Sequence, residues 1–152
     1  MNTLNNKKIV ILELIPTNLK SKNGVIIQLS ALKIDSLKLI DRFDYRLTDE
    51  ALPIIEMKEW INYDNNSFKY VKSDKEILDS FKTFCSDYDL VIIDNGYTKE
   101  YLEYLDNNIL NILDYLNIEY SDDIIDKIMD KYNIEPTNHI VDILYEAIMM
   151  EN

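Results

Sequence analysis

The N-terminal third of the chain alternates between apolar runs and short polar turns, which is the pattern of a strand-rich region. Residues 9–15 are branched apolar side chains interrupted by one carboxylate, Glu13, and such a run is typical of a strand buried on both faces. Residues 25–35 and 39–49 alternate in part between apolar and polar positions, and a three-residue turn separates them. Three consecutive strands with short connections predict an antiparallel meander.

The rest of the chain is predicted to be mostly helical. Apolar side chains recur at helical spacing in residues 74–88, and Ser73 or Asp74 can cap this helix. Residues 89–95 form a compact apolar run, which predicts a central strand parallel to the first. Four further helices are predicted at residues 52–62, 98–117, 121–134 and 137–150. Apart from the short helix at 52–62, the element order is β-β-β-α-β-α-α-α, in a single domain that spans residues 1–152.

Composition limits the location and the chemistry of the protein. With 152 residues and 47% hydrophobic residues, the chain can bury the core of one ordinary domain. No apolar run reaches the roughly 20 residues that span a bilayer, so no membrane association is expected. Cys85 has no second cysteine to pair with, which favours a reducing cytoplasm.

The formal net charge is −12, and it is unevenly distributed. Residues 1–48 contain eight Lys/Arg against four Asp/Glu, whereas residues 49–152 contain eight against 24. An acidic surface repels phosphate backbones, which disfavours direct binding of nucleic acid. Two interpretations stay open: the charge maintains solubility, or it meets a basic protein partner such as a nucleic-acid-binding protein.

Several segments, in the same order, resemble the DEDDh 3′–5′ exonucleases, the family of the proofreading subunit of bacterial replicative DNA polymerase. The resemblance covers nearly the whole chain and is carried by residues 9–19, 25–47, 54–61, 77–95 and 121–147. It implies an α/β, ribonuclease-H-like fold, in which a mixed sheet contains the antiparallel three-strand meander followed by a parallel strand and is flanked by helices.

The family's chemistry requires four carboxylates and a histidine. The carboxylates hold two divalent metal ions, usually magnesium, which activate the attacking water and stabilise the leaving oxygen. The histidine is the general base for that water. Aligned on this pattern, the first acid falls on Glu13 and the last on Asp142, so these two are the candidate catalytic residues and metal ligands.

The other family positions are altered. The second acid falls on Ile15 and the third on Lys99, whose charge would oppose a metal ion. Without a gap, the histidine falls on Thr137. Asp94 and Asn95 replace the family's His-Asn pair, although Asp94-Asn95-Gly96 is also an ordinary turn signal. Glu100 could supply the third acid only after a one-residue shift.

His139 is the only histidine of the chain and lies three residues before Asp142. A two-residue deletion would align it with the family's base, on the same helical face as Asp142. The alternative is a surface or capping histidine.

Glu13 has three interpretations. It is the remnant of a metal-binding acid that faces Asp142 across the first strand and the last helix, it is a working metal ligand, or it reaches solvent at the end of the strand. As a remnant, the two carboxylates could share a metal weakly, share a proton or pair with Lys99.

The leading hypothesis from the sequence is a catalytically inactive exonuclease-like domain that binds a protein, for example as an acidic inhibitor of a nucleic-acid enzyme. It requires no cofactor. The alternative is a 3′–5′ exonuclease acting on single-stranded DNA or RNA ends with magnesium or manganese. That enzyme would use Glu13, Asp142 and His139, with Asp94 or Glu100 as a further acid.

Overall fold

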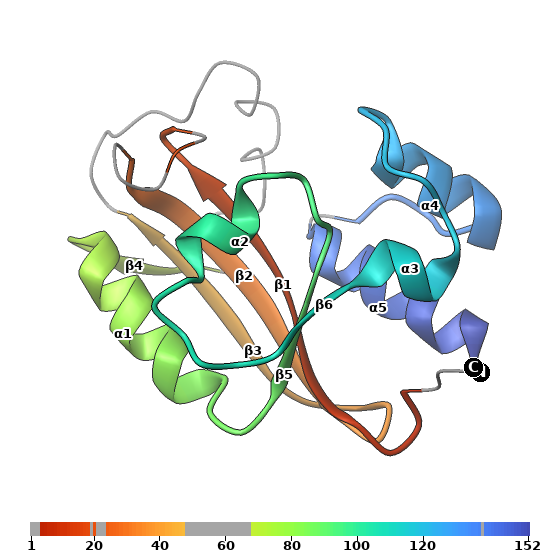
Figure 1. Ribbon diagram of the computed structural model, residues 1–152, viewed down its shortest axis with the longest axis horizontal. Helices are drawn as coiled ribbons and strands as arrows, with labels where there is room; N and C mark the ends of the chain where they lie inside the picture. Colours follow the sequence, from red (N-terminus) through yellow and green to blue (C-terminus); the bar gives the residue numbers. More distant parts are fainter. Residues whose placement is uncertain (1–3, 19, 21–23, 48–67, 138) are drawn as a thin grey trace.

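The strands form one mixed six-stranded sheet with the order β4-β3-β2-β1-β5-β6 (Figure 1). The computed structural model describes residues 4–18, 20, 24–47, 68–137 and 139–152. The strands are β1 (Lys8–Pro16), β2 (Ile26–Asp35), β3 (Lys38–Leu47), β4 (Lys69–Val71), β5 (Asp89–Ile92) and β6 (Ile109–Asn111). Strands β1, β2 and β3 pair antiparallel, and β5 pairs parallel to β1, which confirms the predicted meander and its parallel neighbour.

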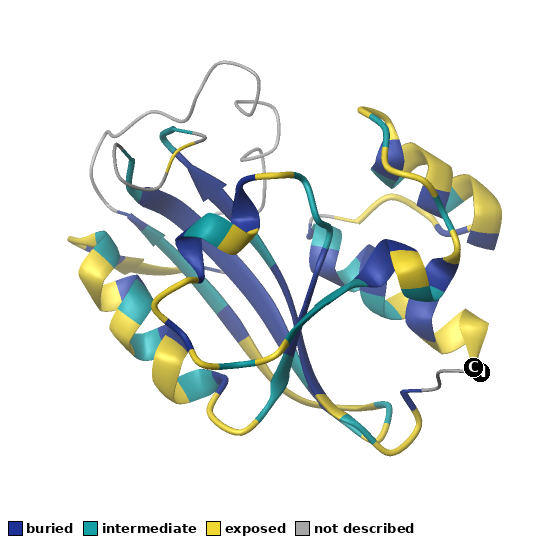
Figure 2. Ribbon diagram, in the orientation of Figure 1, coloured by how far each residue is buried: buried dark blue, intermediate teal, exposed yellow. Residues whose placement is uncertain are grey.

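Helices cover both faces of the sheet. They are α1 (Asp74–Phe84), α2 (Thr98–Tyr101), α3 (Ile112–Leu116), α4 (Ile124–Tyr132) and α5 (Ile140–Glu151). Helix α1 packs against β2, β3 and β4, whereas α5 packs against β1 and β2 and is itself contacted by α3 and α4 (Figure 1). As a consequence, the inner strands are buried, whereas the outward faces of α1 and α4 are exposed (Figure 2).

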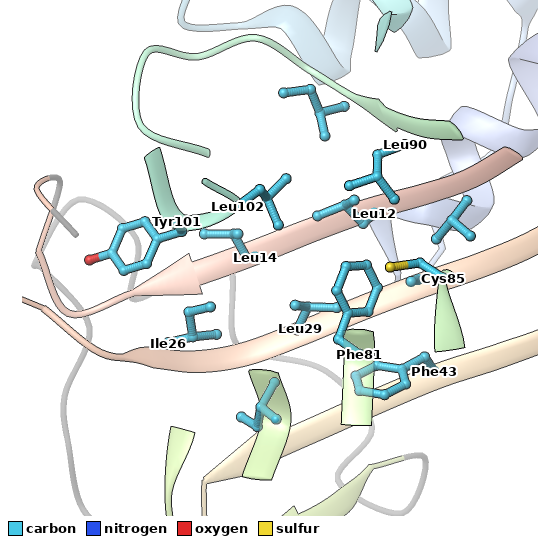
Figure 3. Close-up of a cluster of buried hydrophobic side chains, with 14 of the residues drawn as sticks. Leu12, Leu14, Ile26, Leu29, Phe43, Phe81, Cys85, Leu90, Tyr101 and Leu102 are labelled. Carbon is cyan, nitrogen blue, oxygen red and sulfur yellow. The ribbon is translucent and has the colours of Figure 1, made fainter. Parts of the chain in front are cut away.

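Alternation along the strands divides the core into two layers. Val10 and Leu12 of β1 belong to the layer beneath α1, together with Phe81 of that helix (Figure 3). Ile9 and Ile11 belong to the layer beneath α5. Because side chains alternate between the faces of a strand, Glu13 follows Ile9 and Ile11 onto the α5 face.

Residues 98–117 do not form the single predicted helix. They form α2, a turn, the short strand β6 and α3. Asn107 holds the turn by donating its side-chain amide to the carbonyls of Cys85 (2.8 Å) and Tyr88 (2.7 Å). Asn111 then starts α3 by accepting the amide of Leu113. The local bond of Asn111 starts a new helix, and the contacts of Asn107 tie the preceding turn to the α1–β5 connection, which together explain the break.

One predicted helix cannot be compared with the structure, and two short strands were not predicted. The predicted helix at residues 52–62 lies outside the described residues. Strands β4 and β6 were not predicted, and they pair parallel to β3 and β5. Within the described part of the chain, no helix has the length and apolar character needed to cross a bilayer.

Candidate functional site

A row of polar side chains crosses the sheet beneath α5. Glu13 of β1 pairs in register with Ser30 of β2, which pairs in register with Asp44 of β3. Residues directly opposite each other in an antiparallel ladder share a face, so all three side chains lie on the α5 face. Ser30 is buried, and the Asp44 side chain is only 8% exposed. Buried polar groups at these positions require partners inside the protein.

His139 immediately precedes α5, and its side chain contacts this row. Its Nδ1 lies 3.4 Å from the hydroxyl of Ser30 and 3.4 Å from Oδ1 of Asp44. Both groups therefore approach the same ring nitrogen, whereas a proton relay needs the hydroxyl and the carboxylate on opposite nitrogens. The ring also packs against Phe68, with 5.3 Å between centroids.

The interpretation of His139 as a surface residue is wrong, because His139 is buried. It does stand at the N-cap position of α5, although its side chain makes no capping hydrogen bond. Thr137, the ungapped histidine position, is exposed and donates its hydroxyl to the backbone carbonyl of His139 (2.8 Å). A role for His139 as general base stays a prediction.

Asp142 is held by an arginine from β3. Arg42 donates from both terminal nitrogens to the two carboxylate oxygens of Asp142, at 2.8 and 3.2 Å, and its Nε lies 3.3 Å from Asp44. The hydrogen bond to Asp142 is the main reason why the pKa of Arg42 lies above its ordinary value. Asp142, Arg42, Asp44, His139 and Ser30 thus form one connected polar network.

Lys99, at the third acid position, pairs with Asp94 at 3.3 Å. The predicted pairing of Lys99 with the remnant acids Glu13 and Asp142 is thus replaced by a contact within the β5–α2 connection. The turn predicted at residues 94–96 is present in the same connection. Asn95 accepts hydrogen bonds from the amides of Tyr97 (3.2 Å) and Thr98 (3.0 Å).

The carboxyl end of β1 opens into a pocket of about 380 Å³. The remaining walls are aliphatic side chains from β1, the segment after β5, α4 and α5, and the polar lining consists of Glu13, Asn95, Tyr97, Thr98, Tyr120 and Asp122. The pKa of Tyr97 is raised chiefly by burial, and next by the negative charge of Glu13. The charge of Glu13 therefore acts on another residue of the pocket, Tyr97. This disfavours the interpretation that Glu13 only reaches solvent at the end of the strand.

Sequence reasoning missed several members of this region. Arg42 and Asp44 occupy alternate positions of one strand, so the period of two could have placed them on one face. Asp142, the partner of Arg42, lies 100 residues away from it, so their contact leaves no local signal in the sequence. Tyr120 and Asp122 precede α4 and become pocket residues only through the packing of that helix.

The residues that the structure describes do not fit a two-metal centre. Across the ranges that the structure describes, no group of three or more His, Cys, Asp or Glu side chains is arranged to hold a metal ion. Asp142 is occupied by Arg42, Ile15 is fully buried among apolar side chains, and Lys99 adds a positive charge. Glu13 and Asp142 as metal ligands stay predictions.

Comparison with solved structures places this geometry in a known fold. Exonuclease I with bound product matches with a TM-score of 0.64 and 14% identity, over 95% of this chain and 42% of that one. Exonuclease I from Methylocaldum szegediense matches with a TM-score of 0.67 and 11% identity, over 95% and 39%. A 3′-exonuclease that recognises the histone mRNA stem-loop matches with a TM-score of 0.67 and 10% identity, over 99% and 66%.

No protein-family model and no curated protein matches the sequence significantly. The structural matches show an α/β, ribonuclease-H-like fold of the exonuclease type, as predicted. The chain spans about two fifths of the length of the exonuclease I chains.

The bidentate contact between Arg42 and Asp142 should contribute measurably to stability. We expect a double-mutant cycle with Arg42→Met and Asp142→Asn to give a coupling free energy of roughly 0.5–1 kcal/mol, because both side chains are partly exposed. Urea unfolding of the four proteins at low salt measures it. The coupling should shrink in 0.5 M salt, since partly exposed ion pairs are screened. A coupling of zero at low salt would contradict the contact.

Proposed function

We propose that this chain is an exonuclease-like domain that binds a protein partner and does not hydrolyse phosphodiester bonds with two metal ions. The observation that carries the proposal is the bidentate engagement of Asp142 by Arg42. A carboxylate that neutralises a guanidinium is a weaker metal ligand, because the metal must displace the cation or bind beside it.

The other family positions support the same conclusion. Ile15 offers no oxygen ligand and is fully buried among apolar side chains. Lys99 introduces a cation on the β5–α2 side of the pocket, where its partner is Asp94. Glu13 is then the remaining carboxylate among the family's acid positions whose side chain lines the pocket. Asp122 also lines the pocket but lies at none of the family's acid positions, so the pattern of four carboxylates that holds two divalent ions is not kept.

The distribution of charge supports a basic protein as the partner. Helix α4 exposes Asp126 and Asp130, one turn apart on the same side of the helix. The two lysines of the helix have partners of their own, since Lys127 pairs with Asp123 and Lys131 donates to the carbonyl of Leu116. The two aspartates belong to the part of the chain, residues 49–152, that carries most of the negative charge. Such a surface attracts a basic protein and repels a phosphate backbone. Such a surface would suit an inhibitor that binds the basic surface of a nucleic-acid enzyme.

The proposal predicts no metal-dependent nuclease activity. Single-stranded DNA and RNA labelled at the 5′ end should stay intact with 10 mM magnesium or 1 mM manganese, to the same extent as with Glu13→Gln, because Ile15 and Lys99 stand at two of the four acid positions. Denaturing gel electrophoresis measures the shortening from the 3′ end. Shortening by the wild-type chain that is lost in both Glu13→Gln and Asp142→Asn would overturn the proposal and establish the exonuclease alternative.

The proposal also predicts that the acidic face of α4 contributes to partner binding. In pull-downs from the native host, Asp126→Asn with Asp130→Asn should retain at least threefold less of the partner than the wild type, because two attractive charges are removed. The matched control neutralises two exposed acids elsewhere, Glu103→Gln with Asp106→Asn. Equal retention by the wild type and both variants would show that the acidic face does not bind the partner.

A further inference from the structure

The pocket at the end of β1 has mainly apolar walls, and its rim continues onto the acidic side of α4. We propose that the pocket takes an aromatic side chain of the phenylalanine type from the protein partner, while basic residues next to it in the partner meet the acids of α4. This inference rests on the proposed function, because it assumes that the domain binds a protein, and it identifies the kind of segment that the partner presents.

The walls of the pocket leave apolar surface in contact with water. Ile93, Ile125 and Ile140 line the pocket and are only half-buried. An apolar group that covers them binds favourably, because it removes apolar area from water. The volume of about 380 Å³ lies at the small end of the roughly 300–1,000 Å³ range of ligand pockets, which suits one large side chain.

The polar side chains inside the pocket are already engaged. Asn95 accepts hydrogen bonds from the amides of Tyr97 and Thr98 and from the hydroxyl of Thr98 (2.9 Å). Glu13 and Tyr97 also interact within the protein, so no bond from them to the occupant is required. A charged occupant would lose its water without gaining matched partners, whereas an apolar occupant has no such cost.

Two tyrosines favour an aromatic occupant over an aliphatic one. Tyr97 and Tyr120 both line the pocket, and Tyr97 is buried whereas Tyr120 is 50% exposed. One ring therefore belongs to the interior of the pocket and the other to its mouth. Aromatic rings attract one another in stacked and edge-to-face pairs, in addition to the area that they bury. Aromatic side chains are also common anchors at the centre of protein interfaces.

Carboxylates continue from the pocket along α4. Asp122 lines the pocket, and Asp126 and Asp130 follow it on the exposed side of the helix. Because the pocket and these carboxylates adjoin, one short segment of the partner can contact both. A segment with Lys or Arg next to the aromatic anchor therefore complements this surface.

The lysines of α4 reduce this negative charge without cancelling it. Residues 119–132 contain five acids and two lysines, Lys127 and Lys131. Lys127 pairs with Asp123 at 3.9 Å, and Lys131 donates to the backbone carbonyl of Leu116 at 2.6 Å. The net charge of this stretch is negative, so it attracts a basic segment and repels a phosphate.

The test titrates the ¹⁵N-labelled chain with the peptide acetyl-Arg-Phe-Arg-amide and follows backbone amide shifts by NMR. Saturable shifts are expected at Leu14, Ile93 and Ile125, which line the pocket. The peptide acetyl-Arg-Ala-Arg-amide carries the same charge without the ring. It should bind at least tenfold more weakly, because the apolar walls then stay in contact with water.

Variants of the chain separate the contribution of the wall from that of the charge. Ile125→Ala removes part of the wall and should raise the Kd of the phenylalanine peptide at least threefold. Ile40→Ala, the same truncation at an exposed isoleucine of β3 outside the pocket lining, should bind like the wild type. Asp126→Asn with Asp130→Asn should raise the Kd about threefold, and this effect should disappear in 0.5 M salt, since exposed charges are screened.

Three results would overturn the inference: no shifts at the pocket residues, equal binding of the phenylalanine and alanine peptides, or tighter binding of adenosine monophosphate in the same pocket. Failure of the proposed function gives a different result. If the titration fails but the α4 variant still loses the partner in the pull-down, protein binding stands and only the aromatic anchor is rejected. Metal-dependent nuclease activity would instead reject the proposed function, whatever the titration shows.

Discussion

Closing α5 over the sheet requires that the polar side chains beneath it find partners inside the protein, since a buried polar group without a partner costs free energy. His139 approaches Ser30 and Asp44 from the start of the helix, and Arg42 connects Asp44 to Asp142. These contacts join three segments that are distant in sequence, so the position of α5 depends on them. The wall that α5 gives to the pocket depends on the same contacts.

The same network limits the chemistry of the site. The sequence alignment placed Asp142 at the family's last acid position, and in the structure its carboxylate pairs with Arg42. Lys99 and Asp94 form a second ion pair, between the residues that follow β5 and helix α2. Asp142 and Lys99, which the alignment placed at two acid positions of the family, thus each form an ion pair within the protein.

Local sequence patterns were sufficient for the central fold and insufficient for the site. The three-strand meander and the parallel β5 follow from apolar runs and short turns, and these signals are local. Residues 98–117 were predicted as one helix because their apolar spacing is helical, but the side chains of Asn107 and Asn111 break it. The alignment singled out Glu13, which the structure places beside a pocket, yet it could not show that Asp142 meets Arg42 or that Lys99 meets Asp94. Those pairs depend on which elements the fold brings together, and no spacing within one segment encodes them.

The most direct test of the central claim, that ion pairs have replaced the metal site, is a thermal melt with and without magnesium or manganese for the wild type and Asp142→Ala. A ligand that binds only the folded state stabilises it by about 2.7 kcal/mol at a concentration 100 times its Kd, so a working site would raise the melting temperature visibly. We predict no metal-specific rise in either protein relative to a salt control of equal ionic strength. A rise in the wild type that disappears in Asp142→Ala would show that Asp142 still binds a metal ion and would contradict the account.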